Sequence, residues 1–233
     1  MKILYEDNHV IALVKPPGLA TMGLPEGEET LLTQAKAYIK EKYAKPGEVY
    51  LGVVSRLDVP VTGIVLFART SKAAARLSAQ FREHTVEKIY VALVEGKIAP
   101  PEDICIDYLY DNGSQRRVHR TPTGGGKECR LCYCTLQYPN WRGRPCSLLE
   151  VRLETGRKHQ IRLQLSSRGF PICGDIKYGA SELFSVGPHG GIALHAWKVV
   201  FSHPTTRERI ELAAPLPKEF PTSPIPSLRR FWV

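Results

Sequence analysis

The sequence predicts an α+β fold, because strand patterns and helix patterns follow one another along the chain. Two short apolar runs at the start, Lys2–Glu6 and Val10–Val14, flank an Asp7-Asn8 turn and indicate a pair of strands. From Thr30 to about Tyr43 the apolar residues instead recur at helical spacing. The run Gly63–Ala68 is almost continuously apolar, which is typical of a strand buried on both faces.

The next elements are a second helix and further strands. Ser71 is a suitable N-cap for a helix through about His84, with Leu77 and Phe81 on its inner face. The later strands are expected at Ile89–Val94, Cys129–Tyr138, Ser147–Leu153, Ile192–His203 and Glu208–Ala213.

A third helix is expected between Thr155, as its N-cap, and Gly169, which is placed to end it. Ile161 and Leu165 are four residues apart and would face inward. Arg162 lies about 100° further round the helix than Ile161. Its side chain would therefore project from the edge of the buried face, where it could reach a carboxylate.

One catalytic domain is expected over 1–214, followed by a Pro-rich tail over 215–233 that is extended and frayed. The start of the chain runs directly into a strand, so no secretory signal and no additional module ahead of the domain are expected. No apolar run is long enough to cross a bilayer. These features favour a cytoplasmic protein.

The charge balance favours a polyanionic partner. Lys and Arg number 32 against 23 Asp and Glu, a formal net charge of +9, and RNA is the polyanion that this suggests. A merely basic protein is the alternative. Residues 114–127 form a Gly-rich insert that is expected to be a flexible loop, either contacting phosphates or simply solvated. Its basic residues are Arg116, Arg117, Arg120 and Lys127.

The six cysteines do not favour a metal site. Cys129 and Cys132 form a Cys-x-x-Cys, but no second pair and no histidine pair follows at zinc-finger spacing. Cys132 and Cys134 alternate with Tyr133 and Thr135 as side chains do along a strand. Reduced strand cysteines are the better interpretation, and no metal is expected.

The segment Ser55–Arg69 carries the clearest chemical signal. Asp58 follows Arg56 on a turn marked by Pro60 and Gly63, immediately before the apolar strand. A carboxylate held in this way can serve as a nucleophile. For an isolated Arg-Leu-Asp, a turn aspartate capped by its neighbours is the more frequent explanation.

Four segments in order resemble the RluA branch of the pseudouridine synthases, which convert uridine to pseudouridine within RNA. They are Ile3–Leu19 with its Lys-Pro-x-Gly loop, Arg56–Gly63, Glu87–Gly96, and Leu153–Arg162 followed by Gly169–Asp175. The resemblance runs from about residue 2 to about residue 213. It implies a pseudouridine synthase domain with a mixed, mainly antiparallel sheet flanked by helices, acting without a cofactor on ribosomal or transfer RNA. It also favours a monomer.

The resemblance assigns the central role to Asp58 and an active-site role to Tyr90. We expect Arg162 to orient Asp58 by a bidentate grip, and Arg56 either to fill the gap left by a flipped base or to form a structural salt bridge. Contacts with RNA phosphates are expected from Arg157, Lys158 and His159 at the start of the third helix. A base adduct, a sugar ester and a glycal route all remain open.

Two departures from the family pattern leave alternatives. Ser55 stands where the family usually has histidine, and Val59–Thr62 replaces a run of smaller or hydroxyl-bearing residues. A catalytically weak or inactive RNA-binding paralogue is therefore the second hypothesis. A glycosidase is the third, and it would need a second carboxylate near Asp58, for which Asp175 is the candidate.

Overall fold

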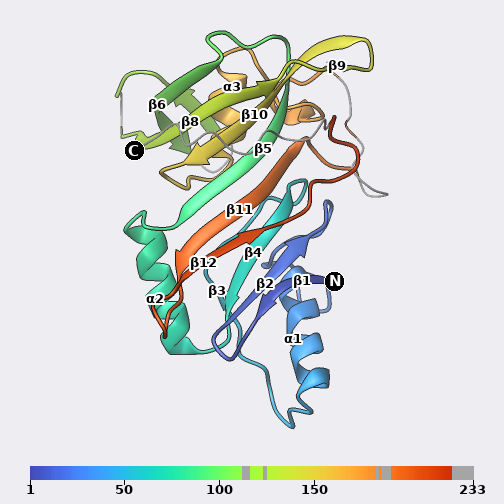
Figure 1. Cartoon of the computed structure of the whole chain (residues 1–233), viewed down its shortest axis with the longest axis vertical. Helices are drawn as coiled ribbons and strands as arrows, with labels where there is room; N and C mark the ends of the chain where they lie inside the picture. The colour runs from blue at the N-terminus through green and yellow to red at the C-terminus, as the bar shows by residue number, and fades with distance from the viewer. Residues whose placement is uncertain (112–115, 123–124, 182–183, 185–189, 222–233) are drawn as a thin grey trace.

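The computed structural model describes residues 1–111, 116–122, 125–181, 184 and 190–221, and their strands form one continuous sheet (Figure 1). The strands are β1 (Lys2–Glu6), β2 (Val10–Lys15), β3 (Gly52–Val53), β4 (Thr62–Ala68), β5 (Glu87–Glu95), β6 (Glu102–Asp111), β7 (Arg116–His119), β8 (Lys127–Gln137), β9 (Asn140–Trp141), β10 (Arg144–Leu153), β11 (Leu194–Ser202) and β12 (Arg209–Ala213). The helices are α1 (Leu31–Lys42), α2 (Ser71–Arg82), α3 (Gln160–Ser166) and the short 3₁₀ helix η1 (Ile176–Tyr178).

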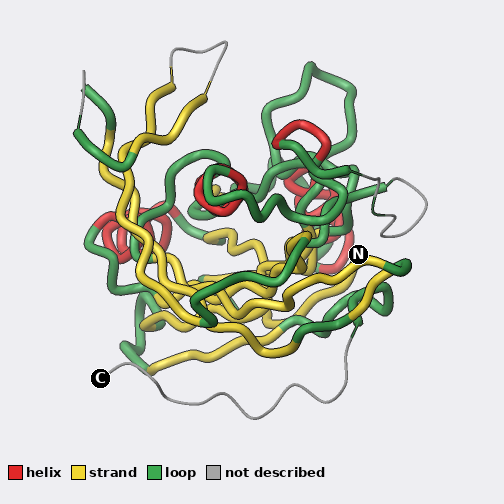
Figure 2. The backbone as a smooth tube through the Cα atoms, turned by 90° about the horizontal axis from the view of Figure 1, so that it is seen from above, coloured by secondary structure: helices red, strands yellow, loops and turns green. Residues whose placement is uncertain are grey.

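The sheet is mixed and mainly antiparallel. Its strand order is β1-β2-β4-β11-β5-β10-β8-β6-β7, with the short or peripheral β3, β9 and β12 paired at its sides. Among the pairs within the described residues, only β4 and β11 run parallel. Figure 2 shows the strands as one curved layer across the molecule. The predicted α+β class is confirmed.

Strand β4 is buried on both faces, as its continuous apolar sequence predicts. Ile64 and Leu66 pack in a cluster with α2, whereas Val65 and Phe67 pack in a cluster with α1. Because successive side chains of a strand point to opposite faces, the two helices cover opposite sides of β4. A strand in this position holds the loop before it in one place.

The first two helices begin at threonine caps. The Thr30 side chain accepts the backbone N–H of Thr33, and Thr70 does the same for Ala73. The predicted N-cap of the second helix, Ser71, is therefore wrong by one residue. Thr70 can serve because its backbone is extended and its hydroxyl reaches the N3 position.

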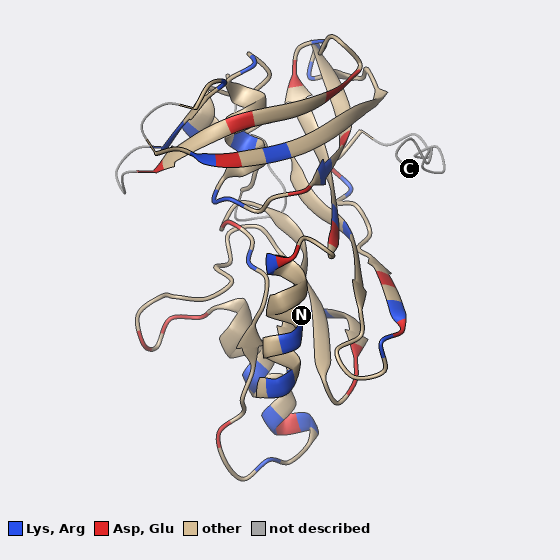
Figure 3. Ribbon diagram, turned by 90° about the vertical axis from the view of Figure 1, so that its left-hand side faces the viewer, with Lys and Arg blue, Asp and Glu red and all other residues tan. Residues whose placement is uncertain are grey.

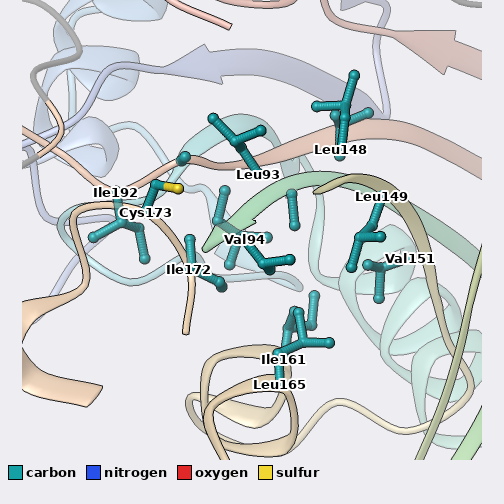
Figure 4. Packing of buried hydrophobic residues seen from close by; sticks show 14 of the residues in the cluster. Leu93, Val94, Leu148, Leu149, Val151, Ile161, Leu165, Ile172, Cys173 and Ile192 are labelled. Carbon is teal, nitrogen blue, oxygen red and sulfur yellow. The ribbon is translucent and has the colours of Figure 1, made fainter. Parts of the chain in front are cut away.

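Helix α3 is shorter than predicted. It begins at Gln160, and the predicted N-cap Thr155 is wrong, because the Thr155 hydroxyl lies 2.8 Å from Gln160 Oε1 and accepts the N–H of Arg130 instead. The prediction for its inner face is confirmed. Ile161 and Leu165 are buried and face the core residues of β5 and β10 (Figure 4).

Strands β6 and β7 were not predicted. The pair is antiparallel, and Arg116 lies opposite Asp111, with which it forms an ion pair at 2.8 Å. The prediction of a flexible loop is therefore wrong for Arg116–His119 and for Lys127, which begins β8, while residues 112–115 and 123–124 of the insert lie outside the described part. Pairing of β7 and β8 with β6 therefore determines the structure of these residues, although the glycines of the insert favour a loop.

The cysteines of β8 lie on different faces of the strand. Cys129 is fully buried in the core face, whereas Cys132 and Cys134 are half-buried and alternate with the buried Tyr133. The members of the Cys-x-x-Cys therefore do not converge, as strand geometry requires. All six cysteines are free thiols.

The described part of the tail returns to the body of the protein. Phe220 is 2% exposed and lies within the main core cluster, so it contacts the domain even though it follows the expected boundary at 214. Pro224 and Pro226 lie outside the described residues. Within the described residues, no helix is long and apolar enough to span a membrane.

Candidate active site

A cleft of about 1570 Å³ opens over the middle of the sheet, where β4, β11 and β5 lie side by side. Basic residues are spread over the whole ribbon (Figure 3). The lining of the cleft, in contrast, has many more basic than acidic residues. The Lys and Arg residues of its lining are Arg56, Arg82, Lys88, Arg157, Lys158, Arg162, Lys177 and Lys198. Among the described residues, Asp58 is the only acidic one in that lining. The cleft therefore suits a polyanion.

Asp58 lies in the loop before β4 and is paired with Arg162. The Arg162 side chain projects from α3 toward this carboxylate, as the helical spacing predicts. Arg162 Nη1 lies 2.9 Å from Asp58 Oδ2, a single hydrogen bond, so the expected bidentate grip on Asp58 is wrong. The remaining edge of the guanidinium forms a bidentate pair with Asp175, through Nε to Oδ2 at 2.6 Å and Nη2 to Oδ1 at 2.8 Å. Asp175 is 2% exposed. The buried Asp175 thus fixes Arg162, and Arg162 fixes Asp58.

This arrangement explains the role of Asp175, which the glycosidase hypothesis needs as a second carboxylate. Both oxygens of Asp175 accept hydrogen bonds from one guanidinium. Such a carboxylate is an anchor for an arginine and not a general acid, which must be able to carry and release a proton.

The backbone around Asp58 is held by a buried lysine. Lys15, at the end of β2, is completely buried, and its Nζ donates to the carbonyl oxygens of Pro16, Leu19 and Val59 at 2.8, 2.8 and 2.9 Å. Burial lowers the pKa of Lys15 to about 7, against the opposing effect of Asp58. All three ammonium hydrogens are used, so Lys15 ties the first motif to the Asp58 loop.

The parallel pair of β4 and β11 depends on a glycine. Gly63 has a φ of +117°, and a Cβ at this position would lie 2.3 Å from the Ala196 carbonyl oxygen. Only glycine permits both the backbone conformation and this approach. The Thr-Gly pair after Asp58 therefore positions β11 beside the site.

Tyr90 projects from β5 into the same cleft. Its strand lies between β10 and β11, with Tyr90 opposite Val151 and Ala196. Burial, followed by the charge of Asp58, raises the pKa of Tyr90 far above its usual value. The phenol is therefore neutral at any physiological pH, so it can donate a hydrogen bond or present its ring to a base.

Lys88 lies two residues before Tyr90 and so on the same face of β5. Its Nζ donates to the Glu154 carbonyl oxygen at 3.3 Å, and burial lowers its pKa to about 8. In the described part of the chain, no carboxylate forms a salt bridge with this ammonium group. Lys88 adds an unneutralised cation to the cleft.

His159 lies closer to Asp58 than a phosphate-binding role requires. Its Nε2 is 3.6 Å from Asp58 Oδ2, and its Nδ1 is 2.6 Å from the Tyr178 hydroxyl. Arg162 lies over the Tyr178 ring, with 4.8 Å from the guanidinium carbon to the ring centre. His159, Arg162 and Tyr178 thus surround one side of the Asp58 carboxylate.

The other expected RNA-binding residues occupy more open positions. Arg56, Arg157 and Lys158 are exposed in the cleft lining, and no ion pair of Arg56 is found within the described residues. Arg120 is exposed beyond β7. Arg116 and Arg117 lie on β7 itself, outside the cleft lining.

Ser55 has a structural contact. Its Oγ accepts the backbone N–H of Leu66 at 2.8 Å, immediately after β3 stops pairing with β4. The hydroxyl thus satisfies a backbone donor of β4 where the ladder ends. This accounts for a small hydroxyl residue at Ser55.

Sequence reasoning missed several members of this site. Lys15 lies in the first family motif without a role of its own, Asp175 is predicted only as a second carboxylate, and Tyr178 has no predicted role in the site. A lysine at the end of an apolar strand was the available signal for Lys15, because such a charge needs buried acceptors. Nothing in the local sequence of Tyr178 indicates its contact with His159.

Comparisons with known proteins agree with these observations. A model of the RNA pseudouridylate synthase family matches residues 9–167. The uncharacterized RNA pseudouridine synthase YlyB of Bacillus subtilis is 33% identical over 94% of this chain and 70% of its own length. Ribosomal large subunit pseudouridine synthase D of Pseudomonas aeruginosa is 32% identical over 94% of this chain and 69% of its own length.

Two further proteins resemble the chain over nearly their whole length. The tRNA pseudouridine synthase C of Pasteurella multocida is 31% identical over 92% of this chain and 90% of its own length. The solved structure of human RNA Pseudouridylate Synthase Domain Containing 4 superposes with a TM-score of 0.75, covering 93% of this chain and 89% of that one at 23% identity. The latter similarity establishes a common fold.

Proposed function

Because this chain belongs to the RNA pseudouridylate synthase family, in its RluA-type branch, we propose how its own residues carry out the reaction and which RNA it serves. The chain is an RNA pseudouridine synthase, an isomerase that converts uridine to pseudouridine. The reaction breaks the bond between the ribose and the base nitrogen and rejoins the base through carbon 5. It needs a nucleophile or charge-stabilising group, a place for the turning base, and a grip on the RNA.

Asp58 is the catalytic carboxylate in this proposal. The contact that carries it is the 2.9 Å pair between Asp58 Oδ2 and Arg162 Nη1, inside a cleft whose other charged lining residues are basic. Arg162, anchored by Asp175, holds the carboxylate ionised and oriented. The ionised group can attack the substrate or stabilise positive charge at the anomeric carbon.

Tyr90 provides the surface for the target base. Its ring lies in the cleft near Asp58, and its neutral hydroxyl can take part in proton transfer. Arg56, which is exposed in the same lining, enters the RNA stack at the place left by the flipped uridine. Lys88 supports this arrangement as a cation beside Tyr90.

RNA phosphates are held by the basic rim. Arg157 and Lys158 lie at the approach to α3, and Arg120 lies beyond β7. Arg116 and Arg117, on the β6–β7 hairpin, extend this basic surface beyond the cleft. Contacts of this kind fix the position of the RNA without reading its sequence.

The substrate class in this proposal is structured ribosomal or transfer RNA, on which the named relatives act. The enzyme acts as a monomer in the cytoplasm and without a metal or cofactor. Positive charge favours association with RNA in general, so the choice of uridine depends on the fold of the target.

The test is tritium release from uridine labelled at carbon 5, in RNA from a source strain that lacks this gene. Pseudouridine formation removes the hydrogen from carbon 5, so release reports the reaction at any site. We expect release with the wild type and none with Asp58→Asn, which should fold and bind RNA almost normally. Asp103→Asn, an exposed aspartate of β6, is the matched control. Release by Asp58→Asn at the wild-type rate would remove Asp58 from the central role.

A further inference from the structure

The backbone of His159 is in a conformation that does not suit histidine. It occupies the N-cap position of α3 with a φ of 59°, in the left-handed region, and its side chain forms no capping hydrogen bond. A residue with a Cβ pays roughly 1 kcal/mol or more for this conformation, which glycine and asparagine adopt more easily. The contacts of the imidazole ring therefore have to explain why histidine stands here.

Those contacts determine which ring nitrogen carries the proton. The hydroxyl of Tyr178 is 2.6 Å from Nδ1, and Asp58 Oδ2 is 3.6 Å from Nε2. If the hydroxyl donates to Nδ1, the proton of the neutral ring is on Nε2 and points at the carboxylate. The opposite tautomer would direct the Nε2 lone pair at a negative charge. Tyr178 as donor is therefore the favourable arrangement.

Both donors near Asp58 act on the same oxygen. Arg162 Nη1 and His159 Nε2 are directed at Oδ2, at 2.9 and 3.6 Å. Within the described residues, Oδ1 of Asp58 has no hydrogen bond. Asp58 retains 24% side-chain exposure. Rotation of the carboxyl group would exchange the two oxygens, and two converging donors oppose that rotation.

We propose that His159, oriented by Tyr178, is a positioning residue that acts with Arg162 to hold Oδ2 of Asp58 and so presents Oδ1 to the uridine. The inference rests on the proposed role of Asp58. At 3.6 Å the contact of Nε2 with Oδ2 is a dipole–charge interaction, and catalytic contacts of this length commonly shorten when the substrate binds.

The ring of His159 is kept neutral chiefly by its burial. Arg162 of α3, Arg116 of β7 and Lys177 of η1 face His159, and they oppose protonation, while Asp58 favours it. Burial is the largest effect, and it lowers the pKa of His159 to about 4. The ring therefore acts through its Nε2–H dipole at neutral pH, and no ionisation of His159 near pH 6.5 should appear in the rate profile.

The decisive variant is His159→Asn, which suits the left-handed backbone but does not reproduce the ring. We expect kcat on a mapped RNA substrate to fall about 10-fold, with KM changed less than about 3-fold and Tm unchanged or higher. Tyr178→Phe should lower kcat by a similar factor, and the double variant should be no worse than either single one, because both act through one contact.

Ala44→Asn is a matched control, because Ala44 is also a left-handed residue, with a φ of 46°, and it is exposed just after α1, outside the cleft lining. We expect this substitution to leave kcat and KM unchanged. Nitrogen-15 NMR of the histidine ring supplies a second measurement. The wild type should show the Nε2-protonated tautomer, and Tyr178→Phe should show a mixture.

Two outcomes would overturn the proposal. A raised KM with unchanged kcat in His159→Asn would make His159 a phosphate ligand, and a lowered Tm with unchanged kcat would make it purely structural. The proposed function is tested separately, because Asp58→Asn is assayed alongside. Loss of turnover in Asp58→Asn with full turnover in His159→Asn would reject only the positioning role.

Discussion

Helix α3 and the turn that ends it carry two arginines, and each is paired with an aspartate in a different environment. Arg162 meets Asp58, whose side chain is 24% exposed, and Arg168 meets Asp107, which is completely buried. Asp107 accepts hydrogen bonds at both oxygens, from Arg168 at 2.8 and 3.3 Å and from Gln164 at 2.6 Å. Asp58 has donors at Oδ2 alone within the described residues.

The difference shows that an arginine–aspartate pair does not by itself indicate a reactive group. Asp107 has no free acceptor oxygen and no access to solvent, so its pair with Arg168 can only join β6 to the end of α3. The Asp58 pair leaves one oxygen open in a basic cleft. Reactivity therefore depends on which lone pairs the protein leaves unused.

The largest expected effect concerns stability and separates the two aspartates. Asp107→Ala should lower the free energy of unfolding by about 3–5 kcal/mol, because it removes the carboxylate that both Arg168 and the fully buried Gln164 contact. Asp58→Ala should cost less than about 1 kcal/mol, since Arg162 keeps Asp175. Urea unfolding followed by circular dichroism measures both. Equal losses would mean that Asp58 is as structural as Asp107.

The second expected effect concerns the rate and separates the two arginines. Arg162→Met should lower the single-turnover rate about 100-fold, roughly 2.7 kcal/mol of barrier, by releasing the Asp58 carboxylate. RNA affinity should change much less. Arg168→Met should destabilise the fold but leave the rate of the folded enzyme unchanged.

Arg162→Lys serves as a check on the first of these variants, because lysine can pair with one aspartate but cannot grip both. We expect its rate to lie between that of the wild type and that of Arg162→Met. A collapse of RNA affinity in Arg162→Met, with an unchanged rate in the bound state, would make Arg162 a phosphate ligand.

The smallest expected effect is a dependence of stability on pH from two buried histidines. Burial lowers the pKa of His159 and of His195 to about 4, below the usual 6.5. Between pH 4 and pH 6.5 the unfolded chain therefore binds more protons than the folded protein. The contribution of the two neutral histidines to stability is complete above pH 6.5 and is lost as the pH falls toward 4. Each should contribute on the order of 2 kcal/mol across this window.

Urea unfolding at pH 7 and pH 4.5 measures this effect. The loss of stability between the two pH values should be smaller in His159→Asn than in the wild type, because only His195 then remains to be protonated. An identical loss in both proteins would show that His159 is already exposed to protons in the folded state.

Much of the fold could be predicted from local sequence, and the failures have a physical pattern. Strand β4 and helix α1 follow from continuous and periodic apolar residues, which record how each element is buried. Strand β7 was missed because Arg116–His119 carries no apolar alternation and depends on pairing with β6. The cap of α3 was misplaced because Thr155 bonds to Arg130, 25 residues away.

The site was less predictable, because its contacts join distant segments. Helical spacing correctly placed Arg162 where it could reach a carboxylate, but that it joins Asp58 to Asp175 is a tertiary fact. His159 was assigned to phosphate from its basic neighbours, whereas its ring faces Asp58 and Tyr178. A family motif thus predicts which residues form the site, whereas the structure is needed to show which atoms each of them contacts.

The position of β11 between β4 and β5 has a consequence for the order in which the site is assembled during synthesis. The strand that follows Asp58 and the strand that carries Tyr90 are both hydrogen-bonded to β11, where His195 pairs with Thr62 and Ala196 with Tyr90, across 133 and 106 residues. Contacts of such sequence separation form slowly, because the intervening chain must first be ordered. A nascent chain whose β11 is still inside the ribosome therefore has no complete cleft, and catalysis begins only after β11 has paired with β4 and β5.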